Sequence, residues 1–161
     1  MLIREQQPAL TLGFWLAPVV AITVAVGCNS SSNQLTAGIN AVKAGDFDLA
    51  LKILRPLADN GDPRAAVEMG NVYAFGWGVR VDDAVAEEWF RRAEAKGITR
   101  GQSHLDVAYE LAAGHGMKRD PGRAREWLQK AANLGSAKAS ELLANSQELK
   151  RLGIGDEPTR Q

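Results

Sequence analysis

Apolar residues recur at helical spacing through most of the chain after residue 34. After Asp46, for example, Ala50, Ile53, Leu54 and Leu57 fall on one side of a helix and form an apolar face. The same pattern predicts no strand. It predicts helices over residues 35–44, 47–60, 63–74, 83–96, 102–113, 121–134 and 136–151.

Aspartate and glycine mark where these helices begin and end. Asp46 is predicted to cap the second helix. The pairs Asp62–Pro63 and Asp120–Pro121 place a capping residue before a first-turn proline, the favoured order at a helix start. Gly61 and Gly135 follow helices, where a left-handed glycine cap is common. The resulting turns are short and favour antiparallel helix pairs.

Residues 69–97 contain a pattern that returns thirty-eight residues later, which indicates an internal repeat. Seven positions agree: Gly76, Gly78, Asp82, Ala86, Trp89, Ala93 and Gly97 correspond to Gly114, Gly116, Asp120, Ala124, Trp127, Ala131 and Gly135. A Gly-x-Gly pair indicates a phosphate-binding loop only between a strand and a helix. Here it follows a predicted helix, so we interpret it as the turn of a helical hairpin.

The helical periodicity also separates inward from outward positions. Trp89 and Trp127 are predicted to lie in the core, and Gly70 to allow close approach of the two helices of one hairpin. Glu87 and Glu88 each lie four residues before an arginine, a spacing that favours ion pairs on the surface of one helix.

This pattern resembles the Sel-one-like repeat family, which is related to tetratricopeptide repeats but has longer turns between helices. The first copy matches at Met69, Gly70, Tyr73, Gly76, Gly78, Val79, Asp82, Ala86, Trp89, Phe90, Arg91, Arg92, Ala93 and Gly97. The second copy lacks the glycine and tyrosine of its first helix. The resemblance covers roughly residues 62–135 and implies an all-α, right-handed α/α superhelix, a short solenoid of antiparallel helix pairs. Members usually act as adaptors that bind proteins or peptides.

The N-terminal segment has the form of a secretory signal. An apolar run at residues 10–26 is followed by Gly27–Cys28 and then by a polar tract. Residues 25–28, Ala-Val-Gly-Cys, resemble a bacterial lipobox, although the charged region is weak and Ala25 stands where leucine is usual. The resemblance implies that Cys28 becomes the lipidated first residue. We therefore expect a signal peptide at 1–27, a lipidated tether at 28–34, a repeat domain at 35–151 and a flexible tail at 152–161.

Two other interpretations of this segment remain open. The apolar run could stay uncleaved as a membrane anchor, or it could form a buried core helix. Its roughly seventeen residues are at the short edge for a spanning helix of about twenty. By resemblance to lipoprotein sorting, Asn29 is unlike an inner-membrane retention signal. We expect the protein in the bacterial cell envelope, lipid-anchored to the outer membrane and facing the periplasm.

Composition and charge argue against several classes of function. Nineteen basic and nineteen acidic residues cancel, so no basic surface for nucleic acid is indicated. His104 and His115 are the two histidines, and Cys28 is the one cysteine, which leaves no complete zinc-ligand set and no predicted metal or cofactor. No serine precedes a lysine by three residues, so the serine-nucleophile motif of penicillin-recognising enzymes is missing.

The first helix of each hairpin should line the concave side of the solenoid. Partner-binding candidates on these helices are Arg64, Val67, Asn71, Gln102, Leu105, Tyr109, Lys138 and Asn145. Val67, Leu105 and Tyr109 are apolar where a solvated face would be polar. They either contact a partner or pack against the neighbouring first helix.

We therefore expect a non-enzymatic module that binds a protein or peptide partner in the envelope. One alternative is a structural or assembly-factor lipoprotein that belongs to a stable envelope complex. A remote alternative is an enzyme related to β-lactam binding, which some members of the family suggest.

Overall fold

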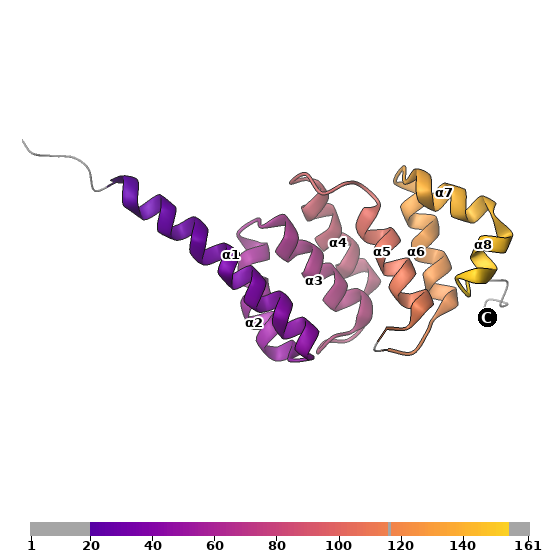
Figure 1. Cartoon of the computed structure of the whole chain (residues 1–161), viewed down its shortest axis with the longest axis horizontal. Helices are drawn as coiled ribbons and strands as arrows, with labels where there is room; N and C mark the ends of the chain where they lie inside the picture. The colour runs from indigo at the N-terminus through magenta and orange to yellow at the C-terminus, as the bar shows by residue number, and fades with distance from the viewer. Residues whose placement is uncertain (1–19, 116, 155–161) are drawn as a thin grey trace, which may run out of the picture.

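The computed structural model describes residues 20–115 and 117–154, which form helices and turns without any strand. The helices are α1 (Val20–Ala44), α2 (Phe47–Asp59), α3 (Pro63–Phe75), α4 (Asp83–Glu94), α5 (Gln102–Ala113), α6 (Pro121–Asn133), α7 (Ala137–Ala144) and α8 (Ser146–Arg151). Helices α2 to α8 stack along one direction, and the N-terminal part of α1 extends away from the stack (Figure 1). The predicted all-α helical-repeat solenoid is confirmed.

Local capping explains where the helices begin. The side chains of Asp46, Asp62, Asp82 and Asp120 each accept a hydrogen bond from a backbone N–H of the first turn that follows. Such a bond satisfies a donor that has no partner within the helix. Helices α3 and α5 end at equivalent residues, Gly76 and Gly114, whose φ angles of 73° and 72° favour glycine. The two repeat units therefore turn in the same way.

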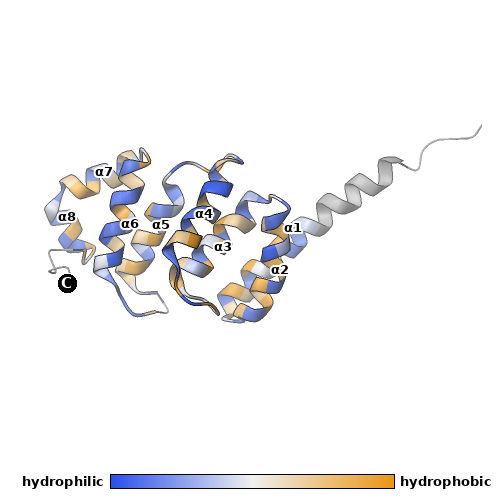
Figure 2. Ribbon diagram, turned by 180° about the vertical axis from the view of Figure 1, so that it is seen from behind, coloured by the Kyte–Doolittle hydropathy of each residue, from blue (hydrophilic) through white to orange (hydrophobic). Residues whose placement is uncertain are grey.

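Each hairpin buries one face of both its helices. Apolar and polar residues alternate along the ribbons, as expected for helices with one buried side (Figure 2). Gly70 of α3 lies against the Phe90 ring of α4, and a Cβ on Gly70 would collide with it. The equivalent pair in the second hairpin is Ala108 and Leu128, both buried in the core. Compared with the first hairpin, the second hairpin thus has a larger residue on its first helix and a smaller residue on its second helix.

The core runs through the stack as two packed clusters. The first contains Leu54, Met69 and Trp89, and the second contains Phe90 and Trp127. Trp89 is 6% exposed and Trp127 is fully buried, which confirms both as core residues. Helices α3 and α4 contribute to both clusters, so this hairpin joins the two halves of the solenoid.

Helix α1 differs from the sequence-based expectation. Residues 28–34 were predicted to be a flexible tether, but they belong to α1. The helical penalty of a serine or asparagine is at most about 0.7 kcal/mol relative to alanine. Leu35 and Ala41 are buried in the core, and Gly38 of α1 lies against Leu54 of α2. Docking of the second half of α1 therefore supports the helix that continues before it.

The C-terminal end also needs two corrections. The helix predicted over residues 136–151 is divided at Asn145, which ends α7 and caps α8 through a hydrogen bond from the Glu148 N–H. The tail was predicted to be flexible from Leu152 onward. However, Ile154 is 1% exposed and packs in the core, because the turn after α8 returns the chain to the stack. The rest of the predicted tail lies outside the described residues.

The predicted signal peptide and lipidation site stay predictions. Residues 1–19 lie outside the described residues, and so does the side chain of Cys28, the predicted lipid attachment point. Among the helices that the structure describes, none combines the length and the apolarity needed to cross a bilayer.

Candidate functional site

Seven of the eight predicted binding residues lie on helices α3, α5 and α7, but one of these seven is unavailable to a partner. Leu105 is 5% exposed and belongs to the core. Its prediction as a contact residue is wrong because α5 packs this side chain inside the solenoid. Val67 and Tyr109 are half-buried and pack against core residues, so each presents only part of its surface. We call the exposed side of α3, α5 and α7 the inner face.

Two carboxylates occupy equivalent positions on this inner face. Glu68 of α3 and Asp106 of α5 are thirty-eight residues apart, the offset of the repeat. Asp106 Oδ1 accepts a hydrogen bond from Gln102 Nε2 at 2.7 Å, and the amide of Asn71, one turn after Glu68, favours the charged form of the Glu68 carboxyl and so lowers its pKa. The amide of Gln102 therefore holds the Asp106 carboxylate through a hydrogen bond.

Desolvation affects both carboxylates in the same direction. Burial raises the pKa of Glu68 above its ordinary value, against the hydrogen bond with Asn71 and the positive charges of Arg64 and Lys43. Partial desolvation likewise raises the pKa of Asp106, against its hydrogen bond with Gln102. Arg64 of α3 and Lys43 of α1, which supply these positive charges, are exposed.

The two predicted residues of the C-terminal end have different roles. Lys138 is exposed, and its Nζ lies 3.0 Å from Glu141 Oε2. It lies on α7, the last of the three helices of the inner face. Asn145 is the cap of α8, so its side-chain oxygen is occupied by the Glu148 N–H at 3.1 Å. We therefore assign Asn145 a structural role.

A second site, which the sequence did not predict, is a cleft between α4 and α6. Its volume is about 480 Å³, and it is lined by Ala84, Glu87, Glu88, Arg91, Glu94, Arg100, His104, Lys130, Asn133 and Leu134. Residues 95–101 connect α4 to α5, whereas only residues 60–62 connect α2 to α3. The longer connection separates α4 from α5, and the cleft lies at this junction.

His104 lies at the floor of this cleft. Its ring packs between Phe90 and Trp127, with centroid distances of 5.3 Å to each. The Nδ1 atom is buried and has no hydrogen-bond partner among the described residues. Glu94 Oε1 is 4.0 Å away, beyond hydrogen-bond distance. Burial lowers the pKa of His104, and the nearby Glu94 carboxylate opposes this effect, so the ring is neutral at pH 7.

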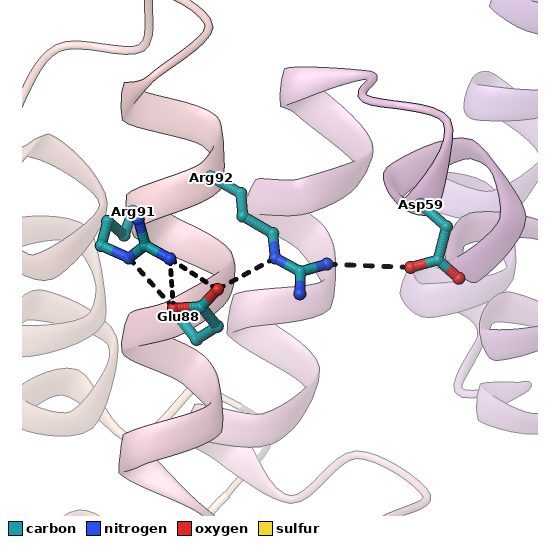
Figure 3. A network of polar contacts seen from close by, with 4 residues as sticks. All are labelled: Asp59, Glu88, Arg91 and Arg92. Carbon is teal, nitrogen blue, oxygen red and sulfur yellow. Dashed lines mark hydrogen bonds and ion pairs between the residues drawn. The ribbon is translucent and has the colours of Figure 1, made fainter.

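Two ion-pair groups line the rim of the cleft. Glu88 binds Arg91 through short contacts of 2.7 Å and also binds Arg92, which extends toward Asp59 of α2 (Figure 3). Glu87 was predicted to pair with Arg91. That prediction is wrong, because Glu87 instead reaches across to Lys130 of α6 at 2.5 Å. Spacing along one helix could not predict this contact between helices.

The described residues contain no group of three or more histidine, cysteine, aspartate or glutamate side chains arranged to hold a metal ion. His115, the other histidine, is exposed in the turn after α5, with Nδ1 3.0 Å from Glu110 Oε2. His104 and His115 thus lie in different environments, one in the core beside the cleft and one at the surface.

Comparison with known proteins agrees with this repeat geometry. Residues 63–98 and 101–136 match the family model for the Sel1 repeat, and these ranges contain the α3–α4 and α5–α6 hairpins. Both hairpins are therefore similar to the Sel1 repeat. Sel1 repeats are a helical-repeat fold and are commonly protein-interaction modules. Helices α1, α2, α7 and α8 lie outside the two matched ranges.

A Sel1 repeat protein from Oxalobacter formigenes is similar to this chain in its solved structure. The two share 28% sequence identity, and the TM-score is 0.44. The match covers 76% of this chain and 96% of that chain. No curated protein matches the sequence.

Proposed function

We propose that the protein is an adaptor whose inner face binds a protein partner or an extended peptide. The observation that carries this proposal is the presence of carboxylates at equivalent positions on neighbouring first helices, Glu68 beside the amide of Asn71 and Asp106 beside the amide of Gln102. The two Sel1 repeats also support it, because the repeat is commonly a protein-interaction module. Stacked repeats offer similar contacts at regular intervals, which suits an extended partner.

Side chains of mixed character lie beside these acidic pairs. Tyr109 and Val67 are half-buried, so each offers apolar area already held in place by the core. Tyr109 combines this area with a polar hydroxyl, a combination frequent at interface anchors. Arg64 and Lys138 add positive charge at the edge. A partner that places basic or amide groups against Glu68 and Asp106 fits this surface.

Site-specific photo-crosslinking in intact cells tests the proposal. A photoreactive residue is placed at Tyr109, at Asn71, or at the exposed Lys52 of α2 as a control. We expect the same protein to be captured from Tyr109 and Asn71 and not from Lys52. Capture of that protein only from Lys52 would contradict the inner-face assignment. A stable complex of fixed stoichiometry would instead favour a structural or assembly role in the envelope.

Paired substitutions provide a second test of the same surface. Tyr109→Ala with Asn71→Ala should weaken capture while circular dichroism shows the helices intact. The control is Asp48→Ala with Lys52→Ala, two exposed residues of α2 where charge removal has little effect on folding. If the Tyr109 and Asn71 variant unfolds, the single Asn71→Ala change still tests the surface, because Asn71 is only partly buried.

We also propose that the protein is attached to the bacterial envelope through lipid on Cys28. The support is the sequence at residues 10–28, an apolar run followed by Ala-Val-Gly-Cys. More than one acyl chain is needed for stable anchoring, and lipoprotein modification would supply them. Cys28→Ser should abolish labelling with radioactive palmitate. A mature protein that retains residues 1–27 would indicate an uncleaved membrane anchor instead.

A further inference from the structure

The cleft between α4 and α6 contains one positively charged side chain that is not neutralised from within. Lys130 is paired with Glu87, and Arg91 is paired with Glu88. Arg100 also lines the cleft, yet it makes no hydrogen bond or ion pair with any residue that the structure describes. Its guanidinium group therefore keeps five N–H donors in a fork that matches a carboxylate.

The floor of the cleft carries a negative charge, in contrast to the positive charge of Arg100. Glu94 Oε1 accepts a hydrogen bond from the Gly101 N–H at 2.9 Å and remains 4.0 Å from His104 Nδ1. The buried Nδ1 has no partner among the described residues, which is costly for a buried polar atom. The negative charge of Glu94 disfavours a carboxylate at the floor and favours a hydrogen-bond donor there.

The walls are suited to a small aliphatic group. Ala84 of α4 and Leu134 at the end of α6 line the cleft between its charged groups. A volume of about 480 Å³ falls within the range of roughly 300–1,000 Å³ that small-molecule sites occupy. The occupant therefore carries a carboxylate at one end, an N–H donor close to it and an apolar side chain.

We propose that this cleft binds the C-terminal residue of a peptide chain. The terminal carboxylate pairs with Arg100, the amide N–H of the last residue faces the floor formed by Glu94 and His104, and the last side chain contacts Leu134. Most of the lining comes from α4 and α6, and His104 reaches the cleft from the buried side of α5, so the site is separate from the inner face, the exposed side of α3, α5 and α7. Recognition of a chain end here is independent of binding there.

The two histidines make a direct test possible. In the full-length chain held in detergent and labelled with ¹³C-histidine, the probe is acetyl-alanyl-leucine with a free carboxylate. We expect a saturable shift of the His104 ring resonance and no shift of His115, which lies outside the cleft. The C-terminal amide of the same dipeptide should bind about tenfold more weakly, the equivalent of one charge-assisted hydrogen bond.

Matched variants identify the group that binds the carboxylate. Arg100→Gln should weaken the free-acid probe by about tenfold, since it removes the charge without disturbing any contact of the described structure. Arg80→Gln, an equivalent change at an exposed arginine that does not line the cleft, should leave binding unchanged.

Three results would overturn the proposal. The first is equal binding of the free acid and the amide. The second is an unchanged affinity in the Arg100→Gln variant. The third is equal binding of acetyl-glutamate amide, whose carboxylate is on the side chain, because the cleft would then recognise any carboxylate rather than a chain end. Inner-face variants serve as a further check, since Asn71→Ala should not alter the His104 shift.

Discussion

Arg123 of α6 binds Asp83 at the start of α4, with a distance of 2.5 Å between Nη2 and Oδ1, and the same nitrogen donates to the Ala74 carbonyl at 2.7 Å. The two side chains are about three-quarters buried, so solvent screens this ion pair less than it screens an exposed pair. One side chain thus joins the C-terminal end of α3, the N-terminal end of α4 and the next repeat.

Removing this contact should destabilise the junction between repeats. Arg123→Ala leaves the Ala74 carbonyl and the Asp83 carboxylate without their donor, and we expect the free energy of unfolding to fall by about 1–3 kcal/mol. Denaturant titration measures it. Arg91→Ala is the control, since its pair with Glu88 is largely exposed and should contribute no more than about 1 kcal/mol. Equal effects of the two changes would contradict the assignment.

Close packing of Gly70 against Phe90 predicts that one added methyl group destabilises the first hairpin. Gly70→Ala directs a Cβ into the Phe90 ring, and overpacking of this kind costs about 1–3 kcal/mol. The double variant Gly70→Ala with Phe90→Leu recreates the Ala108–Leu128 combination of the second hairpin. It should therefore be less destabilised than the sum of the two single changes, as measured by thermal melts.

Trp127 should make one of the largest contributions to stability in the chain. It is fully buried between α5 and α6, and its ring contacts Phe90 and His104. Trp127→Ala should lower the free energy of unfolding by about 3–5 kcal/mol. A melting temperature close to that of the wild type would show that the surrounding side chains collapse into the space left.

Ile154 provides a test of the corrected C-terminal boundary. Because its side chain is 1% exposed and packs in the second core cluster, Ile154→Ala should destabilise the protein by about 2–5 kcal/mol. The exposed Lys150, changed to Ala, serves as the control and should have little effect on a denaturation curve. A flexible tail from residue 152 onward would predict no effect from either change.

His104 predicts a loss of stability in mild acid. Burial lowers its pKa in the folded protein, whereas an unfolded histidine takes up a proton near pH 6.5. Above that pH the His104 ring is neutral in both the folded and the unfolded protein. The loss of stability therefore begins as the pH falls below this value, and it grows until the pH reaches the pKa of His104 in the folded protein. One pH unit below the pKa of the unfolded histidine, the loss of unfolding free energy is at most about 1.4 kcal/mol.

The comparison between pH 7 and pH 5.5 isolates this effect. Glu94, Glu87 and Lys130 face the ring, and the two acidic groups act against the lowering of its pKa. The loss of unfolding free energy over this range should shrink in His104→Gln and persist in His115→Gln, where the exposed histidine is replaced. The same slope in all three proteins would show that other groups cause the acid sensitivity.

Helix boundaries were predictable because their signals are local. Asp62 before a proline and Gly76 after the last apolar turn act within a few residues of themselves, so the sequence indicates them directly. Trp89 and Trp127 followed from periodicity, because each lies on the apolar side of an amphipathic helix. The internal repeat then made the second hairpin a copy of the first.

The errors concern contacts between helices. Leu105 is apolar, and its place in the helical pattern is compatible with either a core residue or a binding residue. It is buried because of how α5 packs against the neighbouring helices, which the sequence of α5 alone does not indicate. Glu87 binds Lys130 of another helix rather than its neighbour in sequence. The cleft beside His104 depends on the path of residues 95–101, and hydrophobic periodicity contains no information about that path.

The length of α1 has a mechanical consequence. A helix rises about 1.5 Å per residue, so the seven residues from Cys28 to Leu35, the first buried side chain described, span about 10 Å. A membrane that holds the protein through lipid on Cys28 would be kept at this distance from the repeats. The helix is stiff, so its docking on α2 also sets the direction in which the inner face points. The repeats would then present the inner face at a fixed distance and angle, whereas a flexible tether would allow many orientations.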